Sequence, residues 1–105
     1  MTITGKAKSV EIIEQIKSAA PVAGITGTEK QIAYAEDIIK NALFNVVRAN
    51  SAYKTLARDS DVSITVDEKI MKALSMHKDA ATIINNKHQY DFASNQMIVD
   101  LITIN

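Results

Sequence analysis

The sequence contains no cysteine and no tryptophan, and it has only one proline and three glycines among its 105 residues. Without cysteine the chain has no disulfide framework, no thiolate zinc site and no cysteine nucleophile. No apolar run approaches the roughly 18 residues that span a bilayer, and residues 1–6 lack the basic-then-apolar order of a signal peptide. We therefore expect a cytoplasmic protein that does not enter a membrane.

A net charge of either sign is also missing, because twelve basic residues balance twelve acidic ones. A strongly basic chain would indicate phosphate binding, and a strongly acidic one would indicate mimicry of nucleic acid. The net charge supports neither. A chain of this length is expected to form one domain, residues 1–105. Its neutrality and its 47% of hydrophobic residues favour a homodimer that buries an apolar stripe.

Apolar residues at helical spacing predict an all-α fold, a small bundle of four helices. The first helix follows Ser9, a typical N-cap residue, and ends before Pro21. The third begins at Thr65, the first residue of an S/T-x-x-E capping box, and continues to residues 85–86. The last begins near Asp91.

The second helix is the longest of the four and organises the predicted bundle. Thr28 and Gln31 form a capping box at its start, and the apolar period extends from residue 29 to residue 56 or 58. Residues 49–52 include Asn50 and Ser51, which favour turns, so the helix either continues or splits there. A split gives five helices.

The two ends of the chain leave one alternative fold open. Leu101–Ile104 fits a strand as well as a helix end, and Thr2–Thr4 can pair with it. The alternative is therefore an α+β fold with a short two-stranded ribbon of the termini. Residues 59–64 are predicted to form a loop.

Few residues are candidates for catalysis or metal binding. His77 and His88 lie near Asp79 and Asp91, but a zinc site needs three or four ligands, and the chain has no further histidine or cysteine. No serine lies in the G-x-S-x-G elbow of a hydrolase. We predict a non-enzymatic protein without a metal or another cofactor.

Residues 56–66 resemble the A-x-x-x-G-V-S-x-x-T-V turn of helix-turn-helix repressors. Asp61 replaces the turn glycine, and the helix that would read DNA opens with two carboxylates, Asp67 and Glu68. Phosphates and base edges require hydrogen-bond donors at such a helix start. The sequence therefore disfavours DNA reading through this motif.

Two blocks of the sequence resemble a group of small proteins encoded by phages, plasmids and conjugative elements. Thr26–Glu36 is similar to T-G-S-E-K-Q-I-A-W-A-E, with changes at Thr28 and Tyr34. Ala80–Lys87 is similar in frame to A-x-W-W-I-D-N-R, without the two tryptophans. The resemblance implies a mobile-element origin and a helical fold, and it brings no catalytic residues.

With this resemblance, the sequence predicts a protein that binds and inhibits a host protein, with a CRISPR-type defence nuclease complex as the hypothesised target. The alternative is a nucleic-acid-binding accessory protein that uses the basic face of the second helix. The candidate contact residues come from the two blocks and from that basic face: Lys30, Tyr34, Lys40, Arg48, Lys54, Arg58, Asn85, Asn86 and Lys87.

Overall fold

Three segments with alternating exposed and buried side chains form an antiparallel sheet in the computed structural model, which describes residues 1–105. The strands are β1 (Thr2–Lys6), β2 (Asp61–Val66) and β3 (Ile102–Ile104), in the order β1-β2-β3. The register places Ile3 opposite Ile64 and Ile64 opposite Ile104. One face of the sheet therefore carries aliphatic side chains, as the period of two along a strand requires.

The fold is α+β, so the predicted all-α bundle is wrong. The alternative ribbon placed strands at the correct ends of the chain, but its pairing is also wrong because β2 lies between β1 and β3. The stretch predicted as a loop, residues 59–64, contributes most of β2. Its alternation of buried and exposed residues is the signal of a strand with one buried face.

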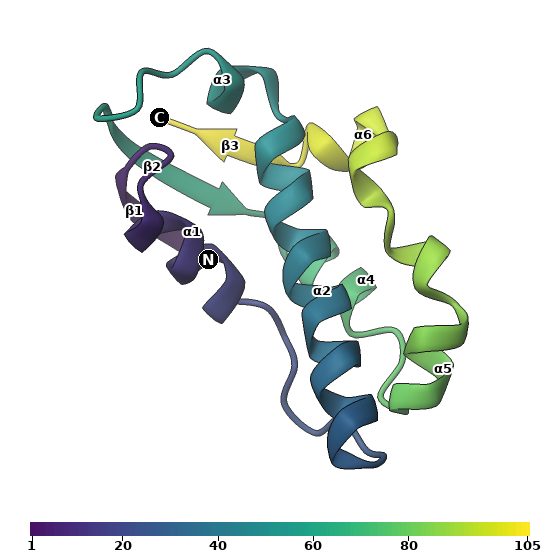
Figure 1. The fold of residues 1–105 in the computed structure, drawn as a ribbon. Coiled ribbons are helices and arrows are strands. Elements are labelled where there is room, and N and C mark those ends of the chain that lie inside the picture. The colour runs from purple at the N-terminus through teal and green to yellow at the C-terminus, as the bar shows by residue number, and fades with distance from the viewer.

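The helical elements follow in chain order around the sheet. They are α1 (Val10–Ser18), α2 (Glu29–Ala49), α3 (Ser51–Lys54), α4 (Glu68–Leu74), α5 (Ala80–Asn85), the 3-10 turns η1 (Lys87–Tyr90) and η2 (Phe92–Ser94), and α6 (Gln96–Val99). Figure 1 shows α2 between the sheet with α1 on one side and α5 and α6 on the other.

Two predicted helix starts are confirmed by their caps. The Ile12 N–H donates to Ser9 Oγ at 3.1 Å, so Ser9 caps α1. The Gln31 N–H donates to Thr28 Oγ1 at 3.2 Å, and the Thr28 N–H donates to Gln31 Oε1 at 3.1 Å. These reciprocal bonds satisfy two donors that a helix leaves free at its N-terminus.

The predicted continuation of the second helix to residue 56 or 58 is wrong, and the split at Asn50 is confirmed. Asn50 has an extended backbone and ends α2, while its side-chain oxygen accepts the N–H of Ala52 at 3.0 Å and so caps α3. Its amide nitrogen donates to the carbonyls of Val99 and Ile102 at 3.3 and 3.1 Å. Asn50 thus connects the end of α2 to α6 and β3.

The predicted third helix is also wrong at both ends. Thr65 belongs to β2, and Asp67 caps α4 by accepting the Lys69 N–H at 2.8 Å. A second cap, Asp79, starts α5 by accepting the Thr82 N–H at 3.0 Å. Because residues 61–66 form a strand, the resemblance to a helix-turn-helix does not extend to the structure.

The predicted last helix is replaced by short elements. η2 and α6 together cover only part of residues 91–102, and the chain then enters β3. Phe92 and Ile102 are buried as expected, whereas Met97 is 81% exposed.

A single cluster of 23 buried residues forms the core between the sheet, α1, α2 and the C-terminal elements. Ile12, Ile39, Leu43 and Ile64 are among its fully buried side chains. None of the helices is both long and apolar enough to cross a membrane.

Candidate functional site: a polar groove beside α2

The two blocks that carry the resemblance lie together at the N-terminal end of α2. The Thr26 N–H donates to the Lys78 carbonyl at 2.9 Å, and the Ala80 N–H donates to the Thr26 carbonyl at 2.8 Å. Gly27 has φ +144°, and a Cβ there would lie 3.0 Å from the Ala80 Cβ. Glycine at this position therefore permits the close approach of the two blocks.

Tyr34 and Lys87 are the two predicted contact residues that the structure joins directly across the blocks. The Lys87 Nζ donates to the Tyr34 hydroxyl at 3.4 Å, between η1 and α2. The Tyr34 side chain remains 47% exposed. An exposed tyrosine next to a cation offers an aromatic surface and hydrogen-bond donors to a partner.

A polar groove with a volume of about 450 Å³ continues from Lys87 along α2. Asn41 and Asn45, one helical turn apart, line it from α2. Lys87, His88 and Asp91 line it from the opposite side. We call these five residues the polar groove. Their amide, ammonium, imidazole and carboxylate groups can both donate and accept hydrogen bonds, which suits polar groups of a protein surface.

Tyr90 lies in the wall of this groove and is 3% exposed. Its hydroxyl is buried and has no hydrogen-bond partner in the protein. Burial raises the pKa of the Tyr90 phenol, because the charged form loses solvation. The hydroxyl is therefore a buried donor with an uncompensated cost.

The structure does not bring the other candidates of the two blocks into the groove. Lys30 is exposed in the first turn of α2, and Asn85 is exposed at the end of α5. Asn86 is half-buried and donates its side-chain amide to the Thr82 carbonyl at 2.8 Å. This bond makes Asn86 part of the helix end rather than a free contact residue.

The predicted basic face of the second helix is wrong as a continuous stripe. Lys40 and Arg48 lie on α2, Lys54 lies on α3, and Arg58 follows α3 in the connection to β2. The break at Asn50 separates the last two from the helix that was expected to align them.

Arg48 and Lys54 nevertheless meet at a second hollow of about 230 Å³, which we call the basic pocket. Its lining consists of three cationic and three apolar or aromatic side chains: Lys8, Ile13, Phe44, Arg48, Tyr53 and Lys54. The Arg48 guanidinium lies 5.3 Å from the centre of the Phe44 ring and donates to Asn45 Oδ1 at 2.9 Å. The basic pocket therefore adjoins the polar groove through the Arg48–Asn45 contact.

Sequence reasoning missed most residues of both hollows. Asn41 and Asn45 carry a usable signal, since two amides one turn apart share the exposed face of a helix. His88 and Asp91 were considered only as metal ligands. Lys8 carries no local signal, because its position beside Tyr53 depends on the packing of β1 and α1 against α3.

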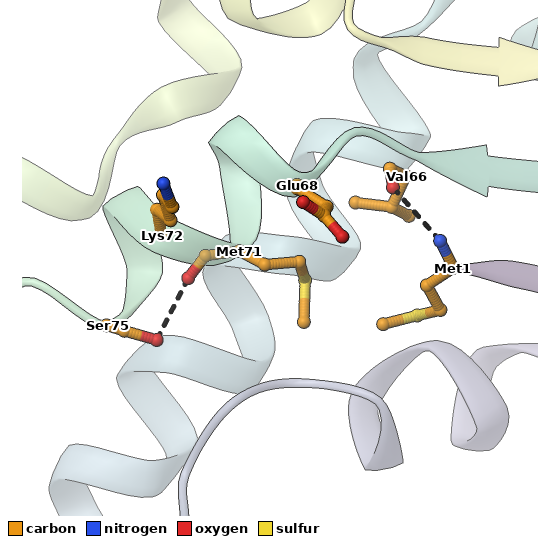
Figure 2. A pocket seen from close by; sticks show the side chains of 6 residues that line it. All are labelled: Met1, Val66, Glu68, Met71, Lys72 and Ser75. Carbon is orange, nitrogen blue, oxygen red and sulfur yellow. Dashed lines mark hydrogen bonds between the residues drawn. The ribbon is translucent and has the colours of Figure 1, made fainter.

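A third hollow, of about 470 Å³, lies between the N-terminus and α4. Figure 2 shows the side chains of Met1 and Met71 on the same side of the ribbon, with Glu68 above them. The Met1 amine donates to the Val66 carbonyl at 3.5 Å, and Ser75 Oγ donates to the Met71 carbonyl at 2.9 Å. Its polar groups thus bond mainly to the backbone around it.

The two histidines do not form a metal site with the neighbouring carboxylates. His77 Nε2 lies 3.4 Å from Gln89 Oε1, and His88 faces the polar groove. The structure contains no group of three or more histidine, cysteine, aspartate or glutamate side chains arranged to hold a metal ion.

Comparison of the chain with protein-family models, with curated proteins and with solved structures finds no match. The site therefore has to be interpreted from its own residues.

Proposed function

We propose that this protein is a non-enzymatic product of a phage or another mobile element, and that it binds and inhibits a host protein in the cytoplasm. The hypothesised target is a CRISPR-type defence nuclease complex. The proposed contact surface consists of the polar groove together with Tyr34. The proposal does not require a cofactor.

One observation supports this proposal above the others. The two blocks that resemble mobile-element proteins are separated by more than forty residues in the sequence, yet they pack against each other and join at Tyr34 and Lys87. The exposed part of this joint continues into the polar groove. A shared surface built from both blocks is expected if the resemblance reflects a common contact with a partner.

The chemistry of the surface favours a protein partner. The polar groove mixes donors and acceptors and contains both charges, whereas a nucleic-acid site would require mainly cations. The four basic residues of the alternative function, Lys40, Arg48, Lys54 and Arg58, do not form one face. We therefore prefer the inhibitor to the nucleic-acid accessory protein.

Inhibition would result from occlusion. A stable complex buries about 800 Å² on each partner, so the groove would form the centre of a larger contact. A rigid helix such as α2 keeps the surface close to its bound form, which lowers the entropy cost of association. Homodimer formation remains a prediction, which light scattering after size-exclusion chromatography tests.

Affinity capture from lysates that express defence nucleases tests the proposal. The wild-type protein is expected to retain a protein partner after nuclease treatment and at moderate salt. The double variant Tyr34→Ala/Lys87→Glu is expected to lose it, while Lys30→Glu/Lys69→Glu, with two exposed lysines reversed elsewhere, is expected to keep it. Recovery of nucleic acid alone, with binding that falls as salt rises, would contradict the proposal.

A further inference from the structure

We propose that the basic pocket binds an acidic protein segment that inserts one apolar side chain between flanking carboxylates. This proposal goes beyond the function of the polar groove and does not depend on it. It rests on the shape of the pocket, its unpaired cations and the rigidity of its wall.

The pocket is formed where four parts of the chain meet. Lys8 comes from the turn after β1, Ile13 from α1, Phe44 from α2, and Tyr53 from α3. Its volume of about 230 Å³ is below the range of roughly 300–1,000 Å³ that holds drug-sized ligands. A single bulky apolar side chain is the kind of group that such a hollow accepts.

The cations around the pocket have no acidic partners. The single ion pair of the structure joins Lys6 to Asp61 at 2.6 Å, so Lys8, Arg48 and Lys54 pair with no carboxylate. Lys17 adds a fourth charge, with its Nζ 5.5 Å from the centre of the Phe44 ring. Unpaired cations gathered around one ring attract a partner of opposite charge.

One of these cations is held in a fixed position. The Lys8 backbone has φ +63°, a left-handed conformation that costs free energy in a residue with a Cβ. Its N–H donates to the Tyr53 hydroxyl at 3.2 Å, and its Nζ donates to the carbonyls of Lys54 and Leu56 at 3.0 and 2.8 Å. Such a conformation persists where the surroundings enforce it, and the result is a preorganised wall.

The aromatic rings indicate a protein segment rather than single-stranded nucleic acid. Tyr53 is 3% exposed, and two cations, Lys17 and Arg48, lie over the Phe44 ring. Neither ring therefore offers an open face for base stacking, which single-strand binding requires. The Arg48 guanidinium can instead hold a carboxylate through two hydrogen bonds.

Fluorescence anisotropy with labelled peptides tests the proposal. The probe is GDEEFEEDG, which carries one phenylalanine between acidic residues. Three competitors are the same peptide with serine for phenylalanine, a peptide with lysine for every acidic residue, and an oligothymidine of equal charge. Saturable binding of the probe is expected, at least about tenfold tighter than binding of the serine peptide, as the loss of a buried apolar anchor implies.

Variants assign the binding to the pocket. Arg48→Glu/Lys54→Glu is expected to weaken probe binding at least about tenfold, and Arg48→Gln/Lys54→Gln is expected to weaken it less, because it removes charge without reversing it. The control Lys69→Glu/Lys72→Glu makes the same charge change on exposed residues of α4 and is expected to leave binding unchanged.

Several results would overturn the proposal. They are absence of probe binding to the wild-type protein, equal affinity for the serine peptide, tighter binding of the oligothymidine, and equal losses in the pocket and control variants. Thermal unfolding of each variant, followed by circular dichroism, confirms that the proteins compared are folded.

Discussion

The two ends of α2 are held in place in different ways. At the N-terminal end, Thr28 and Gln31 exchange two hydrogen bonds at the surface, across only three residues of chain. At the C-terminal end, the buried Asn50 side chain donates to Val99 and Ile102, which follow it by 49 and 52 residues. The first end depends on its neighbours in sequence, whereas the second depends on the complete fold.

This difference predicts where the molecule is sensitive to substitution. A surface cap can be lost at a modest cost, because water replaces the missing partner. A buried amide that satisfies distant carbonyls cannot be lost so easily, because no water reaches the groups left behind. The substitutions below test this contrast in order of decreasing effect.

Asn50→Ala is expected to lower the free energy of unfolding by about 3 kcal/mol. It removes three hydrogen bonds and leaves the carbonyls of Val99 and Ile102 buried without a donor. Chemical denaturation measures the change. Asn41→Ala, which replaces an exposed asparagine of α2, serves as the control and is expected to change stability by less than about 0.5 kcal/mol. Equal losses in the two variants would show that Asn50 has no special role.

Tyr90→Phe is expected to raise the free energy of unfolding by about 1.5 kcal/mol, because it deletes a buried hydroxyl that has no partner. The advantage should grow with pH. Burial raises the pKa of Tyr90 above its ordinary value, so the unfolded phenol ionises first as pH rises past about 10, and the wild-type protein then loses stability.

Denaturation of both proteins at about pH 8 and about pH 10.5 measures this effect, since the other tyrosines are common to both. A gap that stays constant or narrows between these two pH values would contradict the assignment of a raised pKa to Tyr90.

Thr28→Ala is expected to lower the free energy of unfolding by about 1 kcal/mol, the usual cost of losing a helix N-cap. The capping box explains this value, since the Gln31 N–H loses its side-chain acceptor. Thr28→Ser retains the hydroxyl and is expected to recover most of the loss. A loss as large as that of Asn50→Ala would remove the contrast between the two ends of α2.

Tyr34→Phe is expected to change the free energy of unfolding by less than about 0.3 kcal/mol, because its one hydrogen bond, to Lys87, is exposed. Thermal unfolding measures this change. A larger loss would assign Tyr34 to the stability of the fold instead of the surface for a partner.

The sequence predicted those parts of the fold that depend on local motifs. The caps at Ser9 and Thr28 and the weak point at Asn50 are confirmed, because each depends on residues within three or four positions. The sheet was missed because its strands are short and β2 pairs with segments about forty to sixty residues away. In Thr65 and Glu68 a capping motif coincided with a strand end, and the fold instead uses Asp67 as the cap.

The candidate site was predicted only in part for the same reason. Tyr34 and Lys87 were identified from the two blocks, and the structure joins them. Arg48 and Lys54 were expected on one helix, whereas they meet across the break at Asn50. Lys8 and Tyr90 depend on tertiary packing alone, so no pattern within the sequence could reveal them.

The most direct test of the proposed function is lysine labelling of the complex with its captured host protein, measured by mass spectrometry. Lys87, at the rim of the polar groove, and the exposed Lys69 and Lys72 of α4 are each labelled in the free protein. Formation of the complex is expected to protect Lys87 and to leave Lys69 and Lys72 labelled. Full labelling of Lys87 in the complex would contradict the proposal that the polar groove is the contact surface.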